Sequence, residues 1–182
     1  MHMPGRVLIV DDEKAIRWSL GEALRGNGYD VAEAEDGKSG IKAFKEDPAD
    51  IVILDLKLPD RSGIDILKSL KKDDEDLPVI MMTAYGEVET AVEALKNGAY
   101  DFMLKPFQLE KMKVAIKHAL ETRQLRTELD GIRRKDRENY NIRNFIGKSG
   151  VMQEVFETIR KIGESRASTI LIQGESGTGK EL

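Results

Sequence analysis

The sequence predicts a doubly wound α/β domain with a parallel β-sheet, because short apolar runs and amphipathic helical segments alternate five times within about 120 residues. The clearest run is at residues 51–54, where four apolar residues lead directly into Asp55. A continuous apolar run of this length is typical of a strand buried on both faces, as in parallel sheets. Periodicity alone does not separate the two common strand orders of this class.

The other strands and helices follow from the same patterns. An apolar run at residues 6–10 ends in two aspartates, whereas residues 29–34 alternate, which is typical of a more exposed strand. Residues 78–82 and 100–104 complete a set of five predicted strands. Apolar residues recur at helical spacing between the strands, and turns rich in glycine, asparagine or proline separate the segments. The helix between the last two strands carries its apolar pattern on Val88, Val92 and Leu95.

Polar side chains stand where four of these strands end. Asp11 and Asp12 follow the first strand, Asp55 the third, Thr83 the fourth and Lys105 the fifth. Because the carboxyl ends of parallel strands meet at one edge of the sheet, we expect these side chains to share a crevice there. Three carboxylates so close together recruit a cation, and an all-oxygen site suits Mg²⁺.

This set of groups is suited to phosphoryl transfer onto a carboxylate. Asp55 would be the nucleophile and form an aspartyl-phosphate, with Mg²⁺ and Lys105 neutralising charge and Thr83 offering a hydroxyl donor. Each residue alone has an ordinary structural interpretation. A single aspartate after a strand is commonly a turn residue, and Asp11 and Asp12 alone would cap the following helix. The joint placement of four polar strand ends favours the site.

These residues resemble the receiver domain of two-component response regulators over about residues 7–120. The resemblance lies in Val10-Asp11-Asp12-Glu13, in Leu54-Asp55 with Pro59 and Gly63, in Met82-Thr83-Ala84 and in Lys105-Pro106-Phe107. It implies a flavodoxin-like fold with five parallel strands, in which Asp55 accepts a phosphoryl group from a histidine kinase. It also implies the remaining roles: Mg²⁺ binding by Asp11, Asp12, Asp55 and the Lys57 carbonyl, phosphoryl contacts by Lys105 and Thr83, and an aromatic switch at Phe102. As an alternative, Phe102 is a plain core residue.

A long helix is expected to follow the receiver. Helical residues continue from Leu109 past Arg137 without a proline. Leu125, Leu129 and Ile132 could form a dimerisation seam, but it covers little more than one heptad, so a solvated linker helix and a dimerising helix both stay open. We expect a receiver at residues 1–120, a linker helix at 121–143 and a second domain from 144.

Residues 144–182 form a different unit. A predicted helix and a predicted strand at 169–172 lead into the loop Gly174-Glu175-Ser176-Gly177-Thr178-Gly179-Lys180-Glu181. A Gly-x4-Gly-Lys loop after a strand is typical of phosphate binding, although Glu181 stands where a Mg²⁺-binding Ser or Thr is usual. With residues 145–149, the loop resembles the AAA+ ATPase domain of NtrC-like activators of sigma-54 RNA polymerase. The resemblance implies ATP binding in the full-length protein; this part is too short to close a core, so we expect no ATPase activity from it.

The leading interpretation is therefore a phosphorylation-dependent signal receiver, relayed through the linker helix to an ATPase that activates sigma-54-dependent transcription. The expected partners are a histidine kinase, a second copy of the chain and, through further domains, sigma-54 RNA polymerase and DNA. Two alternatives stay open. One is a Mg²⁺-dependent phosphohydrolase using the same acidic cluster, although such enzymes commonly carry a second acid where this chain has Lys57. The other is a purely structural dimerisation module built on the long helix.

Composition excludes several classes of protein. The 182 residues contain no cysteine, which excludes a disulfide scaffold, a cysteine-based zinc site and a thiol nucleophile. The net charge of -4 and the lack of a basic stripe argue against direct nucleic-acid binding by these residues. No apolar run is long enough to span a membrane, and we expect a cytoplasmic protein with no membrane partner.

Overall fold

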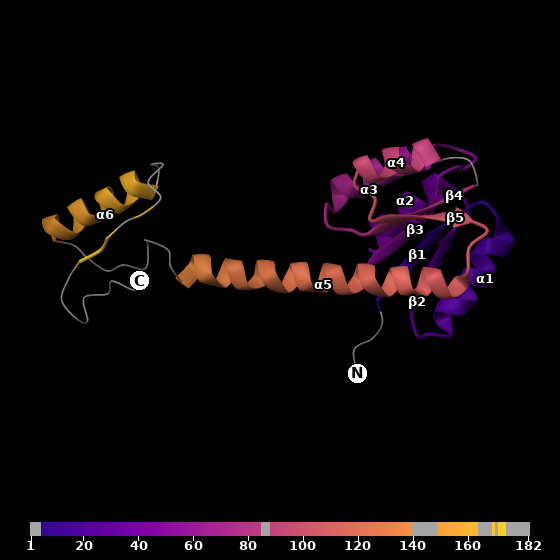
Figure 1. Cartoon of the computed structure of the whole chain (residues 1–182), viewed down its shortest axis with the longest axis horizontal. Coiled ribbons are helices and arrows are strands. Elements are labelled where there is room, and N and C mark those ends of the chain that lie inside the picture. The colour runs from indigo at the N-terminus through magenta and orange to yellow at the C-terminus, as the bar shows by residue number, and fades with distance from the viewer. Residues whose placement is uncertain (1–4, 85–87, 140–148, 164–168, 170, 174–182) are drawn as a thin grey trace. The chain divides into compact units, whose positions relative to one another are not determined.

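The computed structural model describes residues 5–84, 88–139, 149–163, 169 and 171–173. The chain divides into two compact units, Met1–Thr127 and Glu128–Leu182. The first unit contains the sheet and is shown with its helices in Figure 1.

Five parallel strands form the sheet of the first unit. They are β1 (Arg6–Val10), β2 (Asp30–Ala34), β3 (Ile51–Asp55), β4 (Val79–Ala84) and β5 (Asp101–Lys105). Their spatial order is β2-β1-β3-β4-β5, which is the flavodoxin-like order. The predicted fold is thus confirmed. All five residues of the central strand β3 are buried, whereas the edge strand β2 is partly exposed, as their sequence patterns predict.

Helices cover both faces of the sheet, with α2, α3 and α4 on one side and α1 and α5 on the other (Figure 1). Side chains of successive strand residues point to opposite faces, so each central strand contributes to two cores. Leu8 and Leu54 pack with residues of α2 and α3, and Ile9 and Ile53 pack with residues of α1 and α5. The helices are α1 (Lys14–Arg25), α2 (Gly37–Glu46), α3 (Gly63–Asp73), α4 (Val88–Lys96) and α5 (Leu109–Asn139).

Helix α4 forms where its periodicity predicts it. Among the side chains of α4 that the structure describes, Ala94 is buried, whereas Val92 and Leu95 are 45% and 40% exposed. These two residues of the predicted apolar pattern are therefore not core residues of this unit.

Helix α5 continues for 31 residues, as the absence of proline predicts. Its first part closes one core with Met112, Ile116 and Ala119, all buried. Leu125 and Leu129 of the predicted seam are 61% and 53% exposed. None of the helices described is long and apolar enough to cross a membrane.

The second unit contains the helix α6 (Gly150–Gly163), as predicted. The strand predicted at residues 169–172 is wrong for the residues that are described. Residues 169 and 171–173 adopt no regular structure, and Leu171 and Ile172 are largely exposed. Among the described residues no strand pairs with this segment, and without a ladder of hydrogen bonds local β propensity does not suffice. The predicted phosphate loop, residues 174–181, lies outside the described residues.

Candidate functional site

Asp11 lies directly beyond β1, at the carboxyl edge of the sheet. Its amide donates to the Ala34 carbonyl (3.2 Å), which extends the pairing with β2 by one residue. The Asp11 side chain is fully buried, and its Oδ1 accepts the Glu13 amide at 2.8 Å. The N-cap of α1 is Glu13 rather than either aspartate. The capping interpretation of Asp11 and Asp12 therefore does not describe this helix.

Asp55 is the last residue of β3, and Lys105 is the last residue of β5. Asp55 is 6% exposed; its Oδ1 accepts the Lys57 amide at 3.0 Å, and its Oδ2 lies 2.5 Å from Lys105 Nζ. The same ammonium lies 2.7 Å from Asp11 Oδ2 and 3.0 Å from Glu13 Oε1. Lys105 thus neutralises part of the charge that three carboxylates bring to one place.

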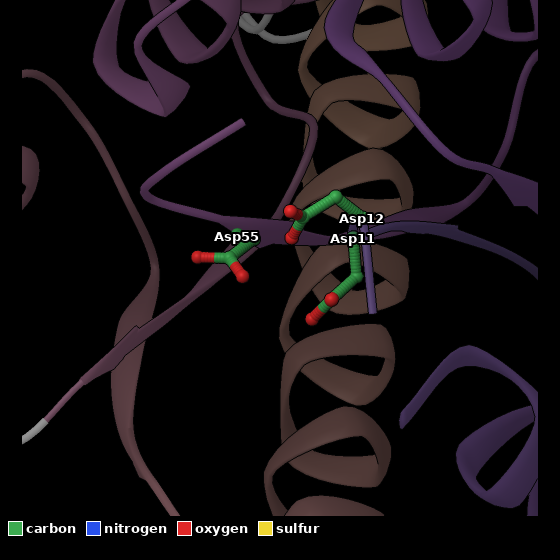
Figure 2. A group of neighbouring side chains, drawn as sticks. All are labelled: Asp11, Asp12 and Asp55. Atoms are coloured by element: carbon green, nitrogen blue, oxygen red, sulfur yellow. The ribbon is translucent and has the colours of Figure 1, made fainter. Parts of the chain in front are cut away.

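The three aspartates lie next to one another at the ends of β1 and β3 (Figure 2). One carboxylate oxygen from each of Asp11, Asp12 and Asp55 lies within 4.8 Å of the others. Asp11 and Asp55 are buried, and Asp12 is exposed on the solvent side of the group. Two buried carboxylates and one exposed carboxylate can together hold a cation that remains partly hydrated.

The donor set fits Mg²⁺ in a second respect. Asp11 Oδ2 is buried and accepts no hydrogen bond of good geometry, although the Lys105 ammonium lies close to it. A buried carboxylate oxygen without a well-formed hydrogen bond lowers the stability of the fold unless a ligand supplies a further interaction. Oxygen ligands of this kind are those that a hard divalent cation prefers.

The electrostatics of the site are those of a crowded acidic cluster. Burial raises the pKa of Asp11 above its ordinary value, and the charge of Asp55 adds to this effect, against the opposing influence of Lys105 and of the Glu13 amide. Burial alone would lower the pKa of Lys105. Its close contacts with the carboxylates of Asp11, Asp55 and Glu13 outweigh this effect and raise that pKa, so Lys105 stays charged.

The other predicted site residues lie on neighbouring elements. Thr83 is buried near the end of β4, one residue beyond Met82, which pairs with Asp55. Phe102 is half-buried in β5 and packs against the core that contains α2 and α3. Its position accommodates both the switch and the core interpretation. Lys57 is the second residue of the loop after β3 and is exposed.

Two residues of the site were not singled out from the sequence. Glu13 contributes the third carboxylate around Lys105, and the guanidinium of Arg17 donates to the Asp11 carbonyl at 2.6 Å. Glu13 stands beside Asp11 and Asp12 in the sequence, so its proximity was a usable signal. Arg17 reaches the site because it lies one helical turn after Glu13, on the first turn of α1.

Comparison with known families matches two segments of the chain. Residues 7–117 match the response regulator receiver domain, and residues 145–182 match the sigma-54 interaction domain. The first match covers the sheet from Val7 onward and all the predicted receiver site residues.

Individual relatives show the same two-part organisation. The chain is 37% identical to the regulatory protein AtoC of Escherichia coli over 177 residues, and 37% identical to the DNA-binding transcriptional regulator NtrC of the same organism over 183 residues. These alignments cover 97% and 98% of this chain but 38% and 37% of the relatives. Among solved structures, NtrX from Brucella abortus superposes with a TM-score of 0.70 at 32% identity, over 88% of this chain and 35% of that one. The chain thus spans well under half the length of these relatives.

Proposed function

Because the chain belongs to the response regulators, with a receiver domain followed by the first part of a sigma-54 interaction domain, we propose that Asp55 accepts a phosphoryl group from a histidine kinase. The observation that carries this proposal is the placement of Asp55. It lies at the end of β3, with Lys105 on its Oδ2 and two further aspartates beside it.

The proposed transfer is balanced within the site. An Asp55 carboxylate oxygen attacks phosphorus as the P–N bond of the kinase phosphohistidine breaks, and the imidazole leaves and takes up a proton. Mg²⁺, held by Asp11, Asp12, Asp55 and the Lys57 carbonyl, would neutralise the phosphoryl oxygens. Lys105 already lies 2.5 Å from Asp55 Oδ2 and would contact a phosphoryl oxygen after transfer. Thr83 would supply a hydroxyl donor to another.

The consequence proposed for the rest of the chain is a relay through α5. Phosphorylation adds charge and acceptor oxygens that draw Thr83 inward and favour movement of Phe102, which changes the surface near α4 and α5. In the whole protein this change would control a homodimer and an AAA+ ATPase that binds ATP through residues 174–181. That ATPase would activate transcription by sigma-54 RNA polymerase on DNA. The match of residues 145–182 supports this part.

The first test is phosphorylation by acetyl phosphate in the presence of Mg²⁺. We expect labelling of the wild-type chain and of Asp65→Asn, an exposed aspartate of α3, but none of Asp55→Asn, when phosphoprotein is separated on phosphate-affinity gels. Sedimentation of the same proteins with beryllofluoride and Mg²⁺ then reports the relay: the wild-type coefficient should change and that of Asp55→Asn should not. Equal labelling of Asp55→Asn, or an unlabelled wild type, would refute the proposal.

A further inference from the structure

The loop between β3 and α3, residues 56–62, has a fixed base. The Gly63 amide donates to the Leu56 carbonyl at 2.8 Å, and Lys57 and Ser62 form an isolated antiparallel bridge. A Cβ on Gly63 would lie 2.3 Å from the Asp55 carbonyl oxygen, so this end of the loop packs directly on the end of β3. These contacts, together with the hydrogen bond from the Lys57 amide to Asp55 Oδ1, hold the backbone at Lys57 but do not reach the tip of the loop.

The tip of the loop contains Asp60, whose carboxylate binds the N-terminus of α2. Asp60 Oδ1 accepts the Gly37 amide at 2.8 Å, and Asp60 Oδ2 accepts the Lys38 amide at 2.9 Å. The first four amides of a helix have no partner within the helix. In α2 the other two are satisfied by a reciprocal pair: the Asp36 side chain accepts the Ser39 amide at 2.7 Å, and the Ser39 hydroxyl accepts the Asp36 amide at 3.3 Å. Two carboxylates from separate segments therefore complete one helix end.

Packing supports the same attachment. A Cβ on Gly37 would lie 2.7 Å from Arg61 Cγ and 2.5 Å from Ile66 Cδ1, so the loop lies directly on the first residue of α2. The hydrogen bond from the Gly37 amide, followed by that from Lys38, lowers the pKa of Asp60, so this carboxylate is charged at neutral pH. A charged acceptor at a helix N-terminus is favoured by the helix dipole.

Among the described residues, a groove borders the loop, lined by Leu56, Lys57, Leu58, Arg61, Ser62 and Thr90. The contacts described for the tip of the loop are therefore those with α2, and Asp60 makes the charged ones.

We propose that Asp60 is a positioning residue of the phosphorylation site. By anchoring the loop to α2, it fixes the direction of the Lys57 carbonyl, the ligand that comes from main chain rather than from an aspartate. This inference rests on the proposed function, because it assumes a Mg²⁺ site at these residues. Groups that orient metal ligands without touching the metal typically change affinity by about 10- to 100-fold.

The test compares Asp60→Ala with Asp36→Ala by calorimetric titration of the whole chain with Mg²⁺. Both variants remove acceptors from the same helix end, and both should lower the melting temperature. Of the two residues, only Asp60 belongs to the loop. We expect Asp60→Ala to weaken Mg²⁺ binding by about 10-fold, Asp36→Ala to leave it unchanged, and Asp60→Asn, which retains one acceptor oxygen, to lie between.

A kinetic measurement separates positioning from general damage. If Asp60 acts through the metal, the rate of labelling by acetyl phosphate in Asp60→Ala should fall at low Mg²⁺ and recover at saturating Mg²⁺. Wild-type Mg²⁺ affinity in Asp60→Ala, or an equal loss in Asp36→Ala, would overturn the inference and leave the proposed function standing. Failure of the wild-type chain to bind Mg²⁺ would overturn both.

Discussion

Asp11 is the residue at which stability and function conflict most directly. It is fully buried, its Oδ2 lacks a hydrogen bond of good geometry, and burial raises its pKa. Neighbouring Asp55 carries charge of the same sign. Lys105 offsets part of this cost but is shared among three carboxylates. Burial and like charge at Asp11 therefore oppose folding, and the proposed cation would offset this cost.

Replacing this carboxylate with its neutral isostere tests that conflict. Asp11→Asn should stabilise the metal-free protein by about 1 kcal/mol, which raises the melting temperature by a few degrees. It should also abolish the further stabilisation that we expect Mg²⁺ to give to the wild type. Differential scanning calorimetry with and without Mg²⁺ measures both effects. Asp12→Asn is the control, because that exposed side chain should not affect metal-free stability; a metal-free Asp11→Asn protein that melts below the wild type would contradict the interpretation.

At the scale of elements, Arg123 joins helix α5 to the end of the sheet opposite the aspartates, where the strands begin. One guanidinium nitrogen donates to the carbonyl of Asp50 at 2.7 Å, and the other to Asp74 Oδ2 at 2.7 Å. Asp50 immediately precedes β3, the strand that ends in Asp55, and Asp74 caps the end of α3. Arg123 thus connects the long helix to the beginning of the strand that carries Asp55 and to the end of α3.

Removing this connection should destabilise the first unit. We expect Arg123→Ala to cost about 2 kcal/mol, because it removes hydrogen bonds from a charged donor to partly buried acceptors. Arg126→Ala is the matched control, since Arg126 lies 3.6 Å from Asp76 with both side chains largely exposed, and it should cost less than about 0.5 kcal/mol. Urea unfolding of the two variants gives the comparison. Equal midpoints for both variants would show that the Arg123 contacts contribute no specific stability.

At the scale of the whole molecule, the first unit contains what a stable domain needs. Met1–Thr127 includes all five strands of the sheet and both hydrophobic clusters. Leu125 and Leu129, on either side of its boundary, are mostly exposed, so little apolar burial is at stake where the unit ends.

A fragment ending at Thr127 should therefore fold by itself. We expect its melting temperature to agree with that of the sheet-containing unit in the full chain within about 2 °C, measured by near-ultraviolet circular dichroism. The signal of Trp18, which lies in α1, reports this unit specifically. A large fall in the melting temperature of the fragment would mean that residues beyond 127 contribute to the stability of the receiver.

The sequence by itself determined the strands and helices of the first unit and the aspartates, threonine and lysine of the site. Apolar runs, helical periodicity and turn residues are local signals, and they place Asp11, Asp55 and Lys105 at strand ends before any tertiary contact is known. Parallel strands share a carboxyl edge, so those side chains had to converge. The resemblance to a known family added the strand order, which the structure confirms.

Only the tertiary structure decided the contacts between segments far apart in the chain. The hydrogen bonds of Asp60 to α2 join residues separated by more than twenty positions, and nothing in the local pattern of either segment predicts them. The exposure of Val92 and Leu95 on α4 likewise depends on how that helix packs in the fold, which its local sequence pattern does not give. Local sequence sets backbone preference and side-chain direction, whereas packing and hydrogen-bond satisfaction across the fold select which of the possible partners meet.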